Sequence, residues 1–215
     1  MSPLLSHLSL SLKVVRELGL GQTISYAIYQ AGKRSGYYRL ATPAGNYAPL
    51  RATIHSPFVL PGREELKNFL GKQARSVIAE ADEVVSGQVR LFSNPPVPLV
   101  LAPADTRWHW THYESHPSSW GVEDIKFLWE PARFGWVFPL GRAYGLTGDE
   151  KYPAVFWRHF ETFILANPPN RGPNWASAQE VALRLMALLF AARAFEESIL
   201  STPDRKAVLA GAVAA

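Results

Sequence analysis

The chain has 215 residues, a formal net charge of +4 at pH 7 and no cysteine. This length suffices for one domain with a sizeable core, and the 47% apolar and 12% aromatic shares indicate a folded chain rather than a disordered one. The lack of cysteine excludes a disulfide framework and a thiolate-held metal. The charge favours an acidic partner, but it includes no run of lysine or arginine, so nucleic acid is a weak candidate.

The first part of the chain, residues 1–40, is expected to form an amphipathic helix followed by a basic arm. Residues 1–12 are apolar but lack the basic start and the cleavage site of a signal peptide. The helix is predicted over residues 13–30, with an apolar face made of Val14, Leu18, Ile24 and Ile28. The arm, residues 33–39, combines basic residues with tyrosines; it could lie on a membrane surface or a glycan, or remain solvated.

The second part, residues 41–122, is expected to lead into a helical domain. A loop over residues 41–61 precedes a helix predicted over residues 63–85, which Gly87 closes. Two short strand-like runs, residues 88–92 and 97–101, flank Asn-Pro-Pro and predict one small hairpin. No segment has the uninterrupted apolar length of a membrane span, so stable membrane insertion is not expected.

An aromatic loop is predicted over residues 106–121. It holds four side chains that could in principle ligate a metal: His109, His112, Glu114 and His116. Their spacing matches no tight ligand set and no cysteine supports them, so we expect no metal there. A loop that stacks on sugar rings, or one that packs over the helical domain, explains the aromatic residues better.

The third part, residues 123–215, is expected to be a series of packed helices. The first is predicted over residues 123–144, with a kink or break near Pro131 and Pro139. Asp149 is expected to cap the second helix, whose apolar face holds Phe156, Phe160 and Phe163.

A third helix of this part is predicted from Ser177 onward. Its expected apolar stripe consists of Val181, Leu185, Leu188, Ala192 and Phe195. A last helix is predicted over residues 204–215, and no glycine, asparagine or polar tail ends it. We therefore expect this part to be truncated at its C-terminus.

Polar residues recur on these helices at spacings that place them together. Trp129, Arg133 and Trp136 are expected to share one face, which could stack on sugars and bind an anion through the guanidinium. Glu180 and Arg184 are four apart, the spacing of a helical ion pair. The alternative interpretation is that these charged residues clamp neighbouring helices together.

An ordered set of motifs supports a family resemblance. The set comprises Asp124-Ile-Lys-Phe-Leu-Trp-Glu-Pro-Ala-Arg133, Ala143-Tyr144, Thr147-Gly-Asp-Glu-Lys-Tyr152, Asn167-Pro168-Pro169, Asn174-Trp175 and Glu180-Val-Ala-Leu-Arg184. Together these motifs resemble the N-terminal helical domain of the heparinase II/III-like polysaccharide lyases. The resemblance covers roughly residues 13–195 and implies a mainly α fold: part of an incomplete α/α toroid, with the small β-hairpin in its lead-in.

The resemblance also implies an activity, β-elimination at a uronic acid of an acidic polysaccharide, such as a glycosaminoglycan, alginate or a bacterial exopolysaccharide. In that chemistry a neutral Asn or His hydrogen-bonds the uronate carboxylate, a Tyr or His removes the C5 proton, and a Tyr protonates the leaving O4. No cofactor is needed. The family suggests the periplasm or the cell surface.

Seven residues match recurrent positions of the family's helical domain and are candidates for substrate binding: Trp129, Glu130, Arg133, Asn174, Trp175, Glu180 and Arg184. No residue matches the family's catalytic motifs, which follow the Glu-Val-Ala-Leu-Arg helix by several turns. We therefore expect the catalytic groups beyond Ala215 and no activity in this fragment. The alternative is a glycan-binding or scaffolding helical domain without chemistry.

Overall fold

The structure, a computed structural model, describes residues 15–17 and 19–215. The predictions for residues 1–14 and for Leu18, including the apolar role of Val14, lie outside these residues. The chain divides into two compact units, Met1–Pro43 and Ala44–Ala215. Each unit is described by itself.

The first unit contains helices α2 (Leu20–Ser35) and α3 (Tyr37–Ala41), joined at Gly36. Gly36 has φ +79°, a left-handed conformation that glycine adopts without strain and that ends α2. The predicted helix is present but ends five residues later than expected, at Ser35. Ile24 and Ile28 of its apolar face are exposed.

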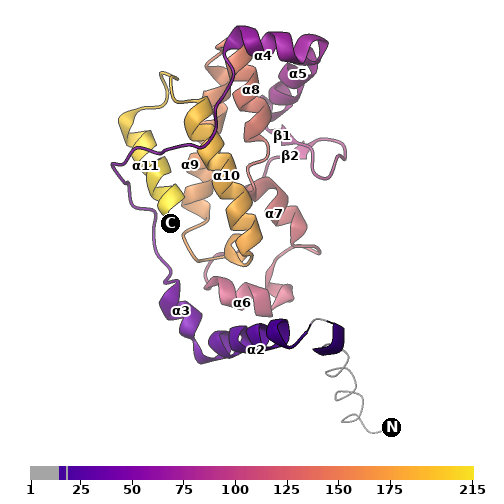
Figure 1. The fold of residues 1–215 in the computed structure, drawn as a ribbon, viewed down its shortest axis with the longest axis vertical. Helices are drawn as coiled ribbons and strands as arrows, with labels where there is room; N and C mark the ends of the chain where they lie inside the picture. The colour runs from indigo at the N-terminus through magenta and orange to yellow at the C-terminus, as the bar shows by residue number, and fades with distance from the viewer. Residues whose placement is uncertain (1–14, 18) are drawn as a thin grey trace. The chain divides into compact units, whose positions relative to one another are not determined.

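The second unit is built mainly from helices (Figure 1). Its elements in chain order are α4 (Arg63–Leu70), η1 (Gly71–Gln73), α5 (Ala74–Val85), β1 (Gln88–Val89), β2 (Val97–Pro98), α6 (Trp110–Ser115), η2 (Pro117–Ser119), α7 (Lys126–Ala132), α8 (Val137–Thr147), α9 (Lys151–Ala166), η3 (Pro173–Trp175), α10 (Ala178–Ala194) and α11 (Pro203–Ala214). The mainly α class is confirmed, and the toroid remains a prediction.

The predicted hairpin is present. Strands β1 and β2 pair antiparallel, with Gln88 opposite Pro98 and Val89 opposite Val97. The strands are shorter than predicted because the chain turns soon after β1, where Phe92 and Ser93 have φ +54° and +62°. Pro98 also lacks the N–H that a longer ladder would need.

The helix predicted over residues 63–85 is interrupted. Gly71 has φ +49°, and a short 3₁₀ turn over Gly71–Gln73 separates α4 from α5. Glycine allows this conformation, whereas a residue with a Cβ atom would be strained there. The prediction of one continuous helix was wrong at this position.

The helix predicted over residues 123–144 is broken, as its prolines suggested. Helix α7 ends one residue after Pro131, and Phe134 then has φ +62° before α8 begins. Pro139 lies in the first turn of α8, where a backbone N–H has no helical acceptor, so its missing N–H is harmless.

The core of the second unit is aromatic and centres on α9. The N-cap of this helix is Glu150, one residue after the predicted Asp149, whose Oδ1 accepts the Lys151 N–H at 2.9 Å. Phe156, Phe160 and Phe163 are buried, which confirms the predicted apolar face. Their rings pack with those of neighbouring helices, for example Phe156 with Phe195 at a centroid distance of 5.2 Å.

Helix α10 begins after Ser177 as predicted, but its buried face differs from the predicted stripe. Leu185 is 37% exposed, whereas Glu180 and Arg184 are only 4% and 5% exposed. The helix is apolar around much of its circumference, so periodicity alone did not identify the face that packs. The polar pair turns inward because it meets polar partners from distant parts of the chain.

The aromatic loop predicted over residues 106–121 contains regular structure, α6 and η2, so that prediction was wrong. The side chain of His109 caps α6, and its Nδ1 accepts the Thr111 N–H at 3.4 Å. The rings of His112 and His116 stack at 4.3 Å. Within the described part of the chain, no group of three or more His, Cys, Asp or Glu side chains could hold a metal.

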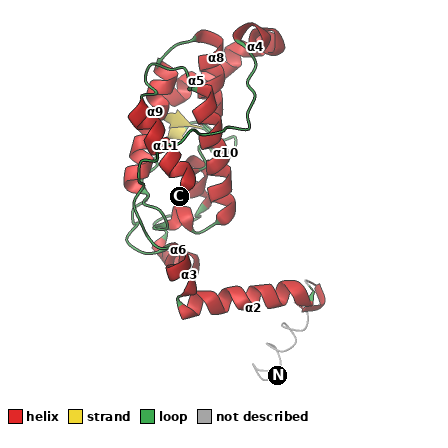
Figure 2. Cartoon of the chain, turned by 60° about the vertical axis from the view of Figure 1, so that its left-hand side comes forward, coloured by secondary structure: helices red, strands yellow, loops and turns green. Residues whose placement is uncertain are grey.

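A long extended segment, residues 44–62, is called the strap here because it runs across α11 and α10 to reach α4 (Figure 2). The Leu50 N–H donates to the Ala207 carbonyl of α11 at 2.8 Å. The Phe58 ring meets Phe190 of α10 edge-on at 5.7 Å. The strap thereby covers α11, whose predicted presence is confirmed.

Replacing Gly211 by alanine should destabilise the fold by about 1–2 kcal/mol, because a Cβ atom there would lie 1.9 Å from the Ala48 carbonyl oxygen of the strap. Alanine favours a helix by about 1 kcal/mol, but this gain is smaller than the penalty for displacing the strap. Gly135 lies in the turn between α7 and α8 and has no atom within 4 Å of such a Cβ, so Gly135→Ala is the control for adding a methyl group in open space. Urea unfolding measures both; a stabilised Gly211→Ala variant would show that the strap is not held against α11.

Burial lowers the pKa of His159 on α9 to about 4, and the nearby Arg158 adds to this effect. The unfolded chain therefore binds the proton more tightly, so stability should fall as pH drops from 6.5 to about 4. His159→Gln should reduce this pH dependence. Urea midpoints measured across this range provide the test, and equal slopes in wild type and His159→Gln would contradict the assignment.

Candidate functional site

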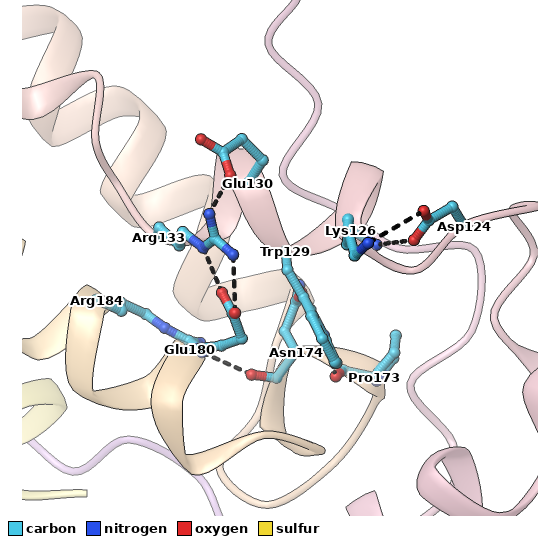
Figure 3. Close-up of polar contacts among 9 residues, drawn as sticks. All are labelled: Asp124, Lys126, Trp129, Glu130, Arg133, Pro173, Asn174, Glu180 and Arg184. Atoms are coloured by element: carbon cyan, nitrogen blue, oxygen red, sulfur yellow. Dashed lines mark hydrogen bonds and ion pairs between the residues drawn. The ribbon is translucent and has the colours of Figure 1, made fainter. Parts of the chain in front are cut away.

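The seven candidate residues come from three elements and lie in one connected cluster. Figure 3 shows six of them, all except Trp175. Trp129 and Glu130 lie on α7, and Arg133 directly follows it. The 3₁₀ turn η3 carries Asn174 and Trp175, and α10 carries Glu180 and Arg184. Two helices and one turn thus bring together residues that are up to 55 positions apart in sequence.

Arg133 occupies the centre of an ion-pair network between α7 and α10. Its Nε and Nη2 donate to the two carboxylate oxygens of Glu180 at 2.5 and 2.9 Å, and its Nη1 donates to Glu130. The Glu180 carboxylate raises the pKa of Arg133. Because all three guanidinium nitrogens already bind carboxylates, Arg133 clamps two helices together rather than presenting a free fork to an anion.

The expected sugar-stacking face of Trp129, Arg133 and Trp136 does not form, because α7 ends before Arg133 and Trp136 precedes α8. Trp136 is only 3% exposed, and its indole N–H donates to the Pro131 carbonyl at 3.0 Å. Trp129 is half-buried and donates to the Pro173 carbonyl at 2.9 Å. Trp136 therefore belongs to the core, and Trp129 ties α7 to η3.

Arg184 differs from Arg133 in its surroundings. Its Nη2 donates to the Asn174 carbonyl oxygen at 2.6 Å, and its guanidinium lies 4.8 Å from the Phe163 ring and 5.2 Å from the Trp175 ring. Among the described residues, its Nε and Nη1 have no hydrogen-bond partner. Burial lowers the pKa of Arg184 to about 10, so the side chain remains charged at neutral pH.

A buried asparagine, Asn167, holds Asn174 in place through hydrogen bonds. Asn174 Nδ2 donates to Asn167 Oδ1 at 2.8 Å, and Asn167 Nδ2 donates to the Leu101 and Phe163 carbonyls at 2.9 Å each. The hydroxyl of Tyr47, on the strap, donates to the Asn167 carbonyl at 2.9 Å. These bonds fix the position of η3 next to α10.

Asn167 and Tyr47 were not among the candidate residues. Asn167 belongs to the Asn167-Pro168-Pro169 motif of the family resemblance, and this motif was a usable signal. Tyr47 gave no such signal, because it lies in a loop 120 residues before its partner. Burial raises the pKa of its hydroxyl, which keeps Tyr47 neutral and able to donate.

A pocket of about 170 Å³ opens beside Arg184. Its walls come from the strap, α9, η3, α10 and the end of α11, and they include Tyr47, Phe163, Trp175, Arg184, Leu188 and Ala212. Most of the lining is apolar. The pocket therefore combines one buried cation with mostly apolar walls.

Tyr113 and His112 on α6 are adjacent, but their geometry does not suit proton transfer to a substrate. Tyr113 is fully buried, and its hydroxyl oxygen accepts the Trp108 N–H at 3.5 Å. The His112 ring stacks on His116. These two residues hold the aromatic segment together.

The profile of the family described as "Heparinase II/III N-terminus" matches residues 63–206, two thirds of this chain. The chain belongs to this family. The resemblance drawn from the motifs is thus confirmed. The region that matches the heparinase II/III N-terminus family includes all seven candidate residues, while the whole strap, with Tyr47, precedes it.

A curated relative agrees with this assignment. A heparin-sulfate lyase from Bacteroides stercoris is 37% identical to the chain over 49 residues, which is 23% of this chain and 7% of that lyase. The match thus spans only a small part of the relative's length. No solved structure matches the chain significantly. In the described residues, no helix is both long and apolar enough to cross a membrane.

Proposed function

We propose that this chain is the N-terminal helical portion of a lyase that cleaves a uronic-acid-containing acidic polysaccharide by β-elimination. The observation that carries this proposal is the match to the heparinase II/III N-terminus family over residues 63–206. The short similarity to a heparin-sulfate lyase and the net charge of +4 support it. In this proposal the catalytic groups lie outside residues 1–215, and the chain alone is inactive.

The proposal gives the seven candidate residues two different tasks. Glu130, Arg133 and Glu180 hold α7 against α10, because their charges already neutralise one another. Arg184 and Trp175 line the pocket and contact the substrate, since each keeps a buried N–H that has no partner among the described residues. Trp129 and Asn174 position η3, the turn that carries Trp175.

The larger architecture belongs to the same proposal. Helix α8 packs on α9 and α10 packs on α11, each pair joined by a short connection, and such helical hairpins are the unit that an α/α toroid repeats. The three-part organisation proposed for the chain is residues 1–40, 41–122 and 123–215. Because large polysaccharides do not cross membranes unaided, the proposal places the enzyme in the periplasm or at the cell surface.

An eliminase assay tests this function. The chain is incubated with alginate, heparan sulfate and related polysaccharides, and the ultraviolet absorption of the unsaturated product is followed. The expected result is no turnover by the chain alone. Robust turnover by residues 1–215 would refute the claim that the catalytic groups lie elsewhere.

A second candidate function is a glycan-binding or scaffolding domain without chemistry. It is favoured by the saturated Arg133 network, which leaves this arginine a structural role. Here too the Arg184 pocket would bind the glycan. Binding that persists unchanged in Trp129→Ala, Arg133→Ala and Trp175→Ala variants would argue against this cluster as the binding site under either candidate.

A further inference from the structure

Arg184 is a buried cation whose hydrogen-bonding capacity is largely unused. A guanidinium carries five N–H groups, yet Nε and Nη1 of Arg184 have no partner among the described residues. Glu180 lies one helical turn away, but both of its oxygens accept bonds from Arg133. Buried polar groups normally find partners, so these unused donors point to an unfilled binding site.

A second donor without a partner lies next to the first. The indole N–H of Trp175 is buried and has no partner in the part of the chain that the structure describes. Its ring lies 5.2 Å from the guanidinium of Arg184, which Figure 3 shows on α10. Both side chains line the same pocket. A tryptophan N–H can only donate, so an occupant of the pocket must supply acceptor atoms.

The size and lining of the pocket restrict the occupant. Its volume of about 170 Å³ is below the roughly 300–1,000 Å³ of sites for drug-sized ligands, so it accepts one small group rather than a length of polymer. The single cation Arg184 balances one negative charge. A dianion such as phosphate would retain an uncompensated charge between apolar walls. A carboxylate attached to a small apolar or ring-shaped body fits both the charge and the lining.

We propose that this pocket is a carboxylate-binding site in which Arg184 and Trp175 donate hydrogen bonds to the ligand's oxygens. The carboxylate can come from a free small acid or from a uronic acid residue of a glycan. The uronic acid source rests on the proposed function, whereas the site itself does not. The sequence motifs did not distinguish Arg184 from Arg133. The two arginines differ in the structure, because Arg133 binds carboxylates through all three of its nitrogens whereas two nitrogens of Arg184 have no partner among the described residues.

The test is a titration of the 15N-labelled chain, followed through the Trp175 indole N–H and the Arg184 Nε–H resonances. The probes are acetate and D-glucuronate at constant ionic strength, with D-glucose as the uncharged control and sodium chloride as the control for ionic effects. Assignments come from Trp175→Phe and Arg184→Lys. Saturable shifts of both resonances with a carboxylate, and none with glucose or chloride, are the expected result.

Two variants separate the pocket from general charge effects. Ala212→Phe fills the pocket from α11 while leaving Arg184 in place, so it should weaken carboxylate binding at least tenfold. Arg193→Gln removes an exposed arginine of α10, the helix that carries Arg184; Arg193 pairs with Glu196, and its loss should leave binding unchanged. Equal weakening by the two variants, or wild-type affinity in Ala212→Phe, would overturn the assignment to this pocket.

The outcomes also separate this proposal from the proposed function. Shifts with acetate alone assign the site to free small acids and support the pocket without supporting polysaccharide recognition. Shifts with both probes support the pocket and a uronic acid source. No saturable shift with either probe overturns the carboxylate site, and it leaves the eliminase and polysaccharide-binding assays to decide the proposed function independently.

Discussion

Replacing Phe156 by alanine should lower the free energy of unfolding by about 3–5 kcal/mol, the range for removing a buried aromatic side chain. Phe156 is fully buried, and its ring packs against Trp157, Phe160 and Phe195 at centroid distances of 4.9, 5.7 and 5.2 Å. The lost side chain would leave a cavity between α9 and α10 that rigid neighbours cannot close. Urea unfolding of the chain measures this difference.

Phe69 provides the matched control, because it is the same residue type on a helix surface and is 85% exposed. Phe69→Ala should change the free energy of unfolding by no more than about 0.5 kcal/mol. If Phe156→Ala lost only about 1 kcal/mol, the average for point substitutions, the aromatic core around α9 would be packed differently from this structure.

Replacing Glu180 by glutamine should destabilise the chain by about 3 kcal/mol. The change keeps the size of the side chain but removes the charge that both Nε and Nη2 of Arg133 bind. Breaking a buried pair costs about 3–5 kcal/mol because it leaves an uncompensated charge. The lower end applies here, since the Arg133 side chain is 26% exposed and keeps its bond to Glu130.

The control for this change is Glu196→Gln on the protein surface. Glu196 also pairs with an arginine, Arg193, but both side chains are about half exposed. Solvent-exposed ion pairs contribute about 0–1 kcal/mol, so this variant should unfold close to wild type. Similar urea midpoints for the two variants would show that the Glu180 pair is not the clamp between α7 and α10.

Local patterns in the sequence predicted much of the fold. The spacing of phenylalanines in α9, by four and then three residues, identified its buried face, because residues at this spacing lie on one side of a helix. Two short β-prone runs around Asn-Pro-Pro predicted the hairpin. The prolines near residue 131 predicted the break between α7 and α8. Each of these features depends on residues that are close in sequence.

Features that depend on distant partners were not predictable in the same way. The burial of Glu180 requires Arg133, which lies 47 residues earlier, and Asn167 receives a hydrogen bond from Tyr47, 120 residues earlier. Phe134 has φ +62°, and Trp136, two residues later, is buried in the core. No periodic pattern in a sequence signals a positive φ at a phenylalanine, so this burial was not predicted. Tertiary contacts therefore determine which candidate residues bind each other and which keep hydrogen-bond donors unused within the described residues.

The candidate site also combines features that local sequence predicts with features that distant contacts determine. The motifs selected seven residues that do lie together, but they did not distinguish an arginine surrounded by carboxylates from one with unused donors. That distinction changes the expected role of each side chain. It makes Arg133 a clamp between α7 and α10, and in the proposed function it makes Arg184 the cation that meets an acidic substrate.

The most direct test of the account is a binding comparison between two forms of one oligosaccharide. The chain is titrated with a uronic-acid-rich oligosaccharide and with its carboxyl-reduced counterpart, and tryptophan fluorescence reports binding. The account predicts saturable binding of the uronic acid form and about tenfold or weaker affinity for the reduced form, because hydrogen bonds to charged groups contribute about 1.5–3 kcal/mol. Equal affinity for both forms, or no binding of either, would contradict it.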